Sequence, residues 1–262
     1  MKFWIRSHKD AAALCDSCRK STYQNRLITV APSHESTIAE SELTVKATSS
    51  KAFFIVGGVG SIITAIAAIW SFLETFTDSL FFWAIGNVLL VIGIILASIG
   101  YLGMRYNYGS GIGVASFAIA IVVSVLVLLR TAWQIVGTEF DYNWLLNIYV
   151  WSVIYEIFFV MIILWGVTHI TTRYFSGNLG VSLASGTMHI ITAVFLQITI
   201  LFQNITFGYL YQSRYYEEEL LALLDIMKIL DLVWILFFFV SQILATVLFF
   251  IAKVPGSSRN TN

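Results

Sequence analysis

Residues 111–129 read GIGVASFAIAIVVSVLVLL, an apolar stretch without a single charged side chain. A helix needs about 20 such residues to cross the roughly 30 Å hydrocarbon core of a bilayer. An open strand is excluded, because lipid offers no partners to its backbone N–H and C=O groups. A barrel strand is excluded as well, since it would alternate polar and apolar residues over about ten positions. Residues 111–129 therefore predict a transmembrane helix.

Five further stretches have the same character, which gives six predicted spans: Ala52–Leu73, Leu80–Met104, Gly111–Leu129, Leu145–Ile170, Val181–Gln203 and Leu232–Ala252. The composition agrees, since 58% of the residues are hydrophobic and 11% are charged. Soluble domains average about 45–50% apolar and about 25% charged residues. We therefore expect an all-α, polytopic membrane protein with a six-helix transmembrane bundle, flanked by an N-terminal cytosolic segment (residues 1–51) and a cytosolic tail (residues 254–262).

Basic residues indicate the orientation, because Lys and Arg are enriched in cytosolic loops. Six spans put both termini on one side of the membrane, and that side carries twelve of the fifteen Lys and Arg residues. The opposite side carries Arg130, Arg214 and Lys228. We therefore expect both termini in the cytosol and the chain in the cell membrane. The N-terminal segment lacks the apolar core of a cleavable signal peptide, and a net charge of zero gives no indication of nucleic-acid binding.

The last two spans are expected to continue beyond the lipid. The fifth could run on to Tyr211, and residues Glu217 to Lys253 could form one helix longer than the bilayer is thick. The acidic start of that stretch suits a helix N-terminus. We expect the two helices to meet in a hairpin around Gln212–Tyr216. The alternative is a separate interfacial helix over Glu217–Ile229.

Small residues predict how the first three spans pack. In lipid, helices associate through close backbone approach at small side chains rather than through hydrophobic burial. The second span carries glycines at seven-residue intervals, which lie in a stripe along one face of the helix. Small residues also cluster in the first and third spans. The small residues are Gly86, Gly93 and Gly100 in the second span, Gly57, Gly58, Gly60 and Ser61 in the first, and Gly109, Gly111, Gly113 and Ala115 in the third. We expect these three spans to form a tightly packed half.

Polar side chains recur on one face of each later span, at helical spacings. They are Tyr149, Ser152 and Glu156 in the fourth span, Ser182, Ser185, His189 and Thr192 in the fifth with Gln197 at the margin, and Asp231, Gln242 and Thr246 in the sixth. At about 1.5 Å of rise per residue, four of these lie near mid-membrane depth. Glu156, His189, Gln197 and Gln242 form the predicted midplane polar cluster.

Glu156 needs a partner, because a charged and unpaired carboxylate at mid-membrane costs several kcal/mol. It is expected to be either neutral and hydrogen-bonded or paired with a cation. Gln242 is the neutral partner that we favour, with His189 and Gln197 as alternatives at similar depth. One interpretation is a polar lock that fixes helix register, and the other is a proton relay or solute site.

Two other interpretations have less support. His169, at the cytosolic end of the fourth span, is expected to be an interfacial side chain. A haem held between His169 and His189 is the alternative, although two scattered histidines carry no ligation signature. Ser185 and His189 share one helix, whereas a serine nucleophile needs an exposed turn and oxyanion donors.

The two cysteines, Cys15 and Cys18, form a C-x-x-C pair in the N-terminal segment. The spacing suits two of the four ligands of tetrahedral zinc. His8 and His34 could complete the site, or two chains could pool their cysteines. The segment would then be a small zinc ribbon with strand-like pieces at Leu27–Val30 and Leu43–Val45. The alternative is a flexible tail.

Together these features favour a non-enzymatic multi-pass membrane protein that acts as a scaffold, regulator or complex subunit. Its expected partners are the lipid bilayer, a protein bound to the N-terminal segment, and a second copy of the chain. The alternative is a small proton-coupled transporter or channel built on Glu156, His189, Gln197 and Gln242. An intramembrane enzyme has the least support, because no catalytic or nucleotide-binding motif stands out.

Overall fold

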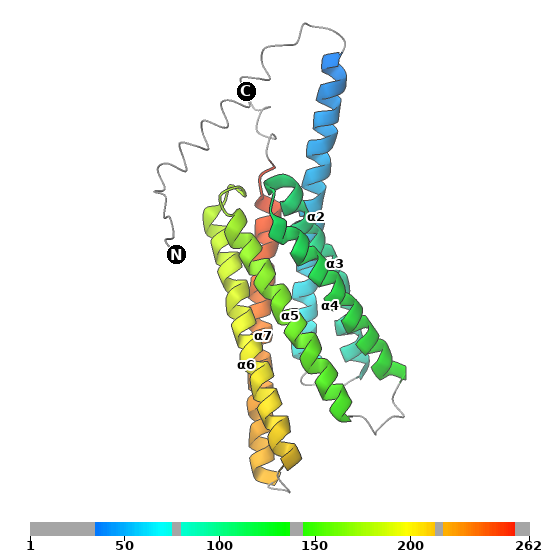
Figure 1. Ribbon diagram of the computed structural model, residues 1–262, viewed down its shortest axis with the longest axis vertical. Helices are drawn as coiled ribbons and strands as arrows, with labels where there is room; N and C mark the ends of the chain where they lie inside the picture. Colours follow the sequence, from blue (N-terminus) through cyan, green and yellow to red (C-terminus); the bar gives the residue numbers. More distant parts are fainter. Residues whose placement is uncertain (1–34, 75–79, 137–143, 213–216, 255–262) are drawn as a thin grey trace, which may run out of the picture. The chain divides into compact units, whose positions relative to one another are not determined.

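The computed structural model describes residues 35–74, 80–136, 144–212 and 217–254. These ranges contain six helices and, within them, no strand: α2 (Glu35–Glu74), α3 (Leu80–Tyr108), α4 (Gly111–Val136), α5 (Trp144–Thr172), α6 (Leu179–Gln212) and α7 (Glu217–Ile251) (Figure 1). Each contains a stretch that is long and apolar enough to cross a membrane. The all-α prediction is therefore confirmed for the described residues, and each helix covers one predicted span to within one residue.

The chain divides into two compact units, Met1–Lys46 and Ala47–Asn262. Of the first unit the structure describes residues 35–46, which are helical. The predicted strand-like piece at Leu43–Val45 is therefore wrong, because the Ala, Glu, Leu and Lys residues around it are strong helix formers. The second piece, Leu27–Val30, lies outside the described residues.

The structure distinguishes between one long helix and a separate interfacial helix at the start of the last predicted span. α7 is continuous from Glu217 to Ile251, so the single long helix is confirmed and a separate interfacial helix over Glu217–Ile229 is wrong. The stretch contains neither Gly nor Pro, the two residues that most often interrupt a helix. α6 extends to Gln212, one residue past the predicted Tyr211. The turn predicted between the two helices, residues 213–216, lies outside the described residues.

Glycines bring α2 and α3 into backbone contact. A Cβ atom built on Gly57 would lie 2.5 Å from Cα of Gly100, and one built on Gly60 would strike the backbone of Ala97. A Cβ on Gly93 would lie 2.6 Å from the backbone nitrogen of Thr64. Because these obstacles are backbone atoms, they cannot rotate away. The predicted close packing of the first two spans is confirmed.

Of the three glycines predicted to pack the third span closely, only one lies against the backbone of a neighbouring helix. A Cβ on Gly113 of α4 would lie 2.5 Å from the carbonyl oxygen of Tyr101 in α3, whereas a Cβ on Gly109 or Gly111 would meet nothing within 4 Å. Gly109 has a positive φ of 71° and forms the turn between α3 and α4. Its role is therefore conformational, since glycine adopts positive φ at no steric cost.

A further glycine contact, which the sequence did not lead us to expect, joins α5 and α6. A Cβ on Gly166 would lie 2.8 Å from the carbonyl oxygen of Gly186, and one on Gly186 would lie 2.7 Å from that of Gly166. The same Cβ on Gly166 would be 3.2 Å from Cβ of His189. The pair thus draws α5 and α6 together beside the polar residues of α6.

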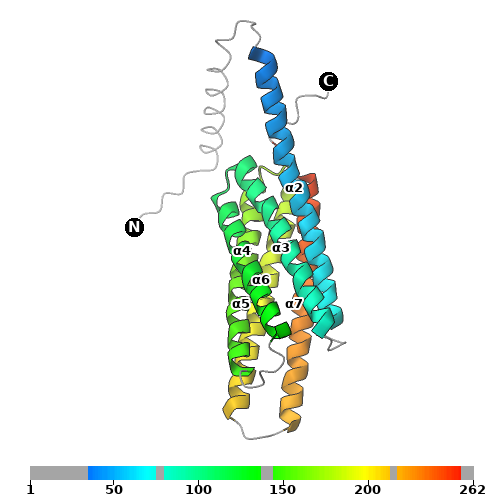
Figure 2. The same ribbon diagram turned by 90° about the vertical axis from the view of Figure 1, so that its right-hand side faces the viewer.

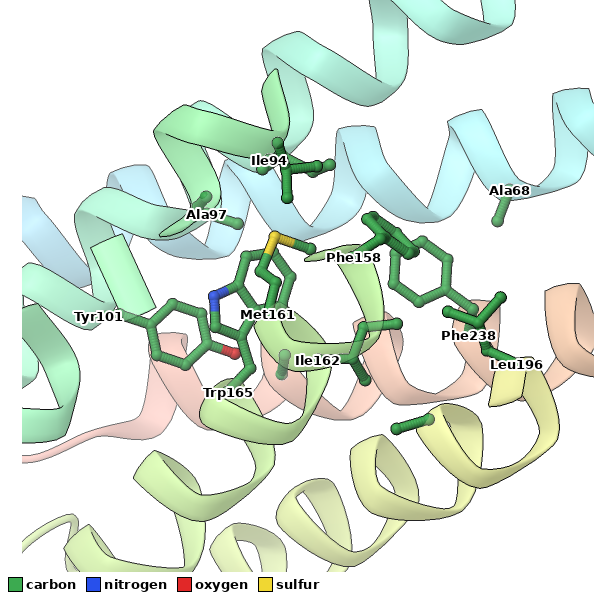
Figure 3. Packing of buried hydrophobic residues seen from close by; sticks show 14 of the residues in the cluster. Ala68, Ile94, Ala97, Tyr101, Phe158, Met161, Ile162, Trp165, Leu196 and Phe238 are labelled. Carbon is green, nitrogen blue, oxygen red and sulfur yellow. The ribbon is translucent and has the colours of Figure 1, made fainter. Parts of the chain in front are cut away.

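Within the unit Ala47–Asn262, helices adjacent in sequence lie side by side. α3 packs against α4, α4 against α5, α5 against α6, and α6 against α7 (Figures 1 and 2). α7 also meets α2, because Phe249 and Phe250 approach Gly57 and Gly58. Bulky apolar side chains fill the space between the helices, including Ile94, Met161, Ile162, Trp165 and Phe238 (Figure 3).

Three chain segments are tied together where α7 ends. Tyr108, the last residue of α3, donates a hydrogen bond from its hydroxyl to the carbonyl oxygen of Lys253 (2.8 Å). The backbone N–H of Lys253 donates to the carbonyl oxygen of Ser176 in the α5–α6 turn (3.2 Å). Gly177 has a φ of 75°, and a Cβ there would lie 2.6 Å from the side chain of Lys253. We call this arrangement the Lys253 tie.

Candidate functional site

The four residues of the predicted midplane cluster form two separate pairs. Gln197 Nε2 donates a hydrogen bond to Glu156 Oε1 (3.2 Å), and Gln242 Nε2 lies 3.3 Å from His189 Nε2. Glu156 is exposed and Gln197 half-buried, whereas His189 and Gln242 have no exposed surface. Of the partners considered for Glu156, the structure thus places Gln197 beside it, and the favoured Gln242 binds His189 instead.

Glu156 lies on the outside because the bulky side chains of α5 occupy its other face. Met161, Ile162 and Trp165 of that face are wholly buried. Glu156 shares its face with Val153 and Val160, which are 44% and 42% exposed. Spacings of three and four residues keep these three side chains on one line along the helix. The carboxyl group therefore belongs to the outer surface of the bundle.

A second polar pair lies about one turn along α5 and about two turns along α6 from the first. Ser152 Oγ of α5 lies 3.0 Å from Asn204 Oδ1 of α6 and donates a hydrogen bond to it. Asn204 is exposed, like Glu156. We call the two pairs, Ser152–Asn204 and Glu156–Gln197, the outer ladder. It joins α5 to α6 on the exposed side of their contact.

An inner cluster of aromatic and polar side chains lies between α3, α5, α6 and α7. All its members have no exposed surface: Tyr101, Trp165, His169, Ser185, His189 and Gln242. The ring of Tyr101 stacks on Trp165 and on His169, with centroids 4.9 Å and 5.1 Å apart. Figure 3 shows the Tyr101 and Trp165 rings against each other. His169 in turn meets His189 edge to face at 5.2 Å.

Ser185 connects the two histidines. Its hydroxyl lies 2.8 Å from Nδ1 of His169, and its backbone carbonyl lies 2.8 Å from Nδ1 of His189. A carbonyl only accepts and an amide nitrogen only donates. His189 therefore donates from Nδ1 to Ser185 and accepts at Nε2 from Gln242.

Four polar atoms of the inner cluster have no hydrogen-bond partner among the described residues: Tyr101 Oη, Trp165 Nε1, His169 Nε2 and Gln242 Oε1. Most buried polar atoms in proteins are paired, and an unpaired one costs about 1–3 kcal/mol. Ring packing, rather than a complete hydrogen-bond network, must therefore stabilise this cluster. The stacked Tyr101 ring is the centre of that packing.

The expectation for His169 is wrong, since its side chain is buried and not interfacial. The reason is Tyr101, which covers the imidazole from α3. The rings of His169 and His189 touch directly, with no space between them for a haem macrocycle.

Ser185 and His169 form a serine–histidine contact between two helices. Both side chains are wholly buried, and Ser185 lies inside the continuous helix α6. A nucleophilic serine needs access for a carbonyl substrate and donors for an oxyanion. The contact is therefore structural. The predicted polar face of this span points inward as a whole, since Ser182, Ser185, His189 and Thr192 are all buried.

Metal binding has no support in the part of the chain that the structure describes, where no group of three His, Cys, Asp or Glu side chains is placed to hold an ion. The predicted zinc ligands lie outside the described residues: Cys15, Cys18, His8 and His34. Zinc at the C-x-x-C pair stays a prediction.

Comparison of the chain with protein-family models, with curated proteins and with solved structures finds no match. No function is therefore transferred from a relative. The function has to be inferred from the helices, the outer ladder and the inner cluster themselves.

Proposed function

We propose that this chain is a multi-pass membrane protein that serves as a non-enzymatic subunit or scaffold of a membrane complex. Its six apolar helices support the membrane location. The excess of Lys and Arg on one side supports cytosolic termini.

The observation that carries the proposal is the position of Glu156. α5 runs from Trp144 to Thr172, so this exposed carboxyl lies about 18 Å from one end of the helix and about 24 Å from the other. Ionisable residues at such depth usually face the bundle interior, because exposure to lipid is costly. A second protein helix on this face would shield the exposed carboxyl group from lipid. A complex subunit needs such a face.

The separation of the two polar pairs favours a subunit over a proton-coupled transporter. A relay would need its titratable groups along one path through the bundle. His169 and His189 are wholly buried, whereas Glu156 faces outward. The carboxyl and the imidazoles therefore serve different contacts.

Proteoliposomes test this choice. The purified protein is reconstituted with an internal pH-sensitive dye, and a pH gradient is imposed across the membrane. We expect the gradient to decay no faster than in protein-free liposomes. A faster decay that Glu156→Gln or His189→Leu abolishes, while the variant stays folded, would establish the transporter instead.

The size of the native assembly tests the subunit role directly. Protein extracted from its own membranes in mild detergent should migrate, in native electrophoresis, well above the mass of a single 29.4 kDa chain. Migration as a single chain would contradict the proposal.

Thiol labelling tests the orientation. In intact cells, Cys15 and Cys18 should resist a membrane-impermeant maleimide, because the basic N-terminal segment is expected in the cytosol. A cysteine placed at Ser213, in a chain without the native pair, should react. Labelling of the native pair from outside would reverse the orientation.

A further inference from the structure

The proposed cytosolic end of the bundle carries cations and no carboxylate. In the unit Ala47–Asn262, the described segments at this end are residues 51–53, 104–112, 171–180 and 252–254. They contain neither Asp nor Glu, and their basic residues are Lys51, Arg105, Arg173 and Lys253. Three of these side chains are exposed and that of Arg173 is half-buried. We call these four residues the basic rim.

The segments of the basic rim lie at one end of the bundle (Figure 1). The Lys253 tie joins the end of α7 to α3 and to the α5–α6 turn. The ring of Tyr108 also stacks on Phe54 of α2 and on Phe175 of the turn, with centroids 5.7 Å and 6.1 Å apart. The cations therefore gather around one aromatic centre, without an acidic side chain from these segments to neutralise them.

Arg173 and Lys253 are held at the same turn. A Cβ on Gly177 would lie 2.6 Å from Cδ of Lys253, so the lysine side chain packs against the α5–α6 turn. The guanidinium of Arg173 lies over the Tyr174 ring, 4.7 Å from its centroid, and Nη2 donates a hydrogen bond to the Tyr174 hydroxyl (3.1 Å). That bond uses one of the five donors of the guanidinium. A phosphate group accepts two parallel hydrogen bonds from a guanidinium.

The exposed rings beside these cations favour a lipid over a soluble anion. Tyr106 and Tyr174 are each 69% exposed, and Phe175 is 59% exposed. Tyrosine is enriched at the level of the lipid headgroups, where one side of the ring meets water and the other meets hydrocarbon. A phospholipid places its phosphate beside the cations and its glycerol and acyl chains beside the rings. A soluble anion would leave the rings uncovered.

We infer that Arg173 and Lys253 bind the phosphate group of an anionic phospholipid in the leaflet at this end of the bundle. Basic residues near a membrane surface attract anionic lipids, and the lack of carboxylates in the basic rim leaves this attraction unopposed. The inference rests on the proposed function, because it requires the bundle to lie in a membrane. The proposed orientation makes this leaflet the inner one.

Lipid competition tests the site. The purified full chain is incubated in detergent with equal amounts of phosphatidylglycerol and phosphatidylcholine of identical acyl chains, and the bound lipids are counted by native mass spectrometry. The chain should retain phosphatidylglycerol in preference. Arg173→Gln and Lys253→Gln should each lower this preference about 5-fold, and the double variant about 25-fold, because each removes one basic side chain from the surface.

Two controls separate the site from general charge and from folding. Lys228→Gln removes an exposed cation of α7 from the opposite end and should leave the preference unchanged. Arg173→Lys combined with Lys253→Arg keeps both charges and should keep most of the preference. Thermal unfolding in detergent without lipid checks that each variant is folded. No preference in the wild type would overturn the inference, as would an equal loss in either control and in the double glutamine variant.

Inorganic phosphate distinguishes a lipid from a soluble ligand. At constant ionic strength, phosphatidylglycerol should raise the unfolding temperature of the delipidated protein, whereas inorganic phosphate should not. A rise with phosphate that the double glutamine variant lacks would assign the site to a soluble phosphate compound and refute the lipid.

The two proposals fail in different ways. A chain without lipid preference that migrates in a large native assembly would refute the lipid site and leave the subunit role standing. A chain that prefers phosphatidylglycerol but migrates alone from native membranes would refute the subunit role only.

Discussion

The contact between α2 and α3 and the inner cluster hold helices together in opposite ways. Between α2 and α3 the backbones touch, because Gly57, Gly60 and Gly93 offer no side chain to separate them. Where the inner cluster joins α3 to α5, stacked rings of Tyr101, Trp165 and His169 fill the space between the two helices.

The difference predicts how each region responds to mutation. A backbone contact tolerates no added atom, whereas a ring contact tolerates the loss of a polar atom but not the loss of the ring. The hydrogen bonds of the cluster rank below both, because four of its polar atoms are unpaired.

The largest effect is expected from removal of the Tyr101 ring. Tyr101→Ala should lower the free energy of unfolding by about 3–5 kcal/mol, as for other large aromatic residues in a core. Tyr101→Phe should change it by less than about 0.5 kcal/mol, because the hydroxyl meets no hydrogen-bond partner in the described part of the chain. Unfolding by sodium dodecyl sulfate in mixed micelles measures both. A costly Tyr101→Phe would show that the hydroxyl is hydrogen-bonded after all.

An added methyl group in the backbone contact should cost less. Gly60→Ala forces its Cβ against the backbone of Ala97, and overpacking of this kind costs about 1–3 kcal/mol. Gly111→Ala is the matched control, since a Cβ there meets nothing within 4 Å. The same unfolding measurement should show the control within about 0.5 kcal/mol of the wild type. Equal costs for the two would refute the backbone contact.

Hydrogen bonding in the cluster should contribute less again. Gln242→Leu removes the donor to His189 Nε2 and should cost about 0.6–2 kcal/mol, the range for interhelical hydrogen bonds in membranes. Combined with His189→Leu, the loss should be smaller than the sum of the two single losses, because both variants remove the same bond. Strict additivity would show that the two side chains do not interact.

The smallest effect is expected on the outer surface. Glu156→Leu should change the stability of the detergent-solubilised monomer by less than about 0.5 kcal/mol, because the side chain is exposed and its hydrogen bond is to the half-buried Gln197. A loss above about 1 kcal/mol would mean that Glu156 supports the fold of one chain. That result would argue against a role in assembly.

The sequence predicts the backbone contact between α2 and α3 because the glycines that cause it can be read directly from the sequence. Gly93 and Gly100 lie one heptad apart on a helix, and in lipid small residues mark close approach. The apolar stretches likewise predict the helices, since length and hydropathy are properties of a single segment. These features need no knowledge of the neighbouring helices.

The face of α5 that points into the bundle could not be predicted in this way. Its helix carries a polar line through Glu156 and a bulky line through Met161 and Trp165, and both lines have helical spacing. Because ionisable residues in membranes usually face the bundle interior, we expected the face of Glu156 to point inward. In the structure the bulky face of Met161 and Trp165 points inward instead. Tyr101 gave no signal either, because an aromatic residue in an apolar span looks the same whether it meets lipid or a histidine.

The Lys253 tie gives the end of α7 a mechanical property. Tyr108 and Ser176 hold the backbone of Lys253 from two other places in the bundle. Tension applied to the chain beyond Lys253 is therefore shared at once by α3, by the α5–α6 turn and by α7. The end of α7 is therefore held against unwinding by contacts outside its own helix.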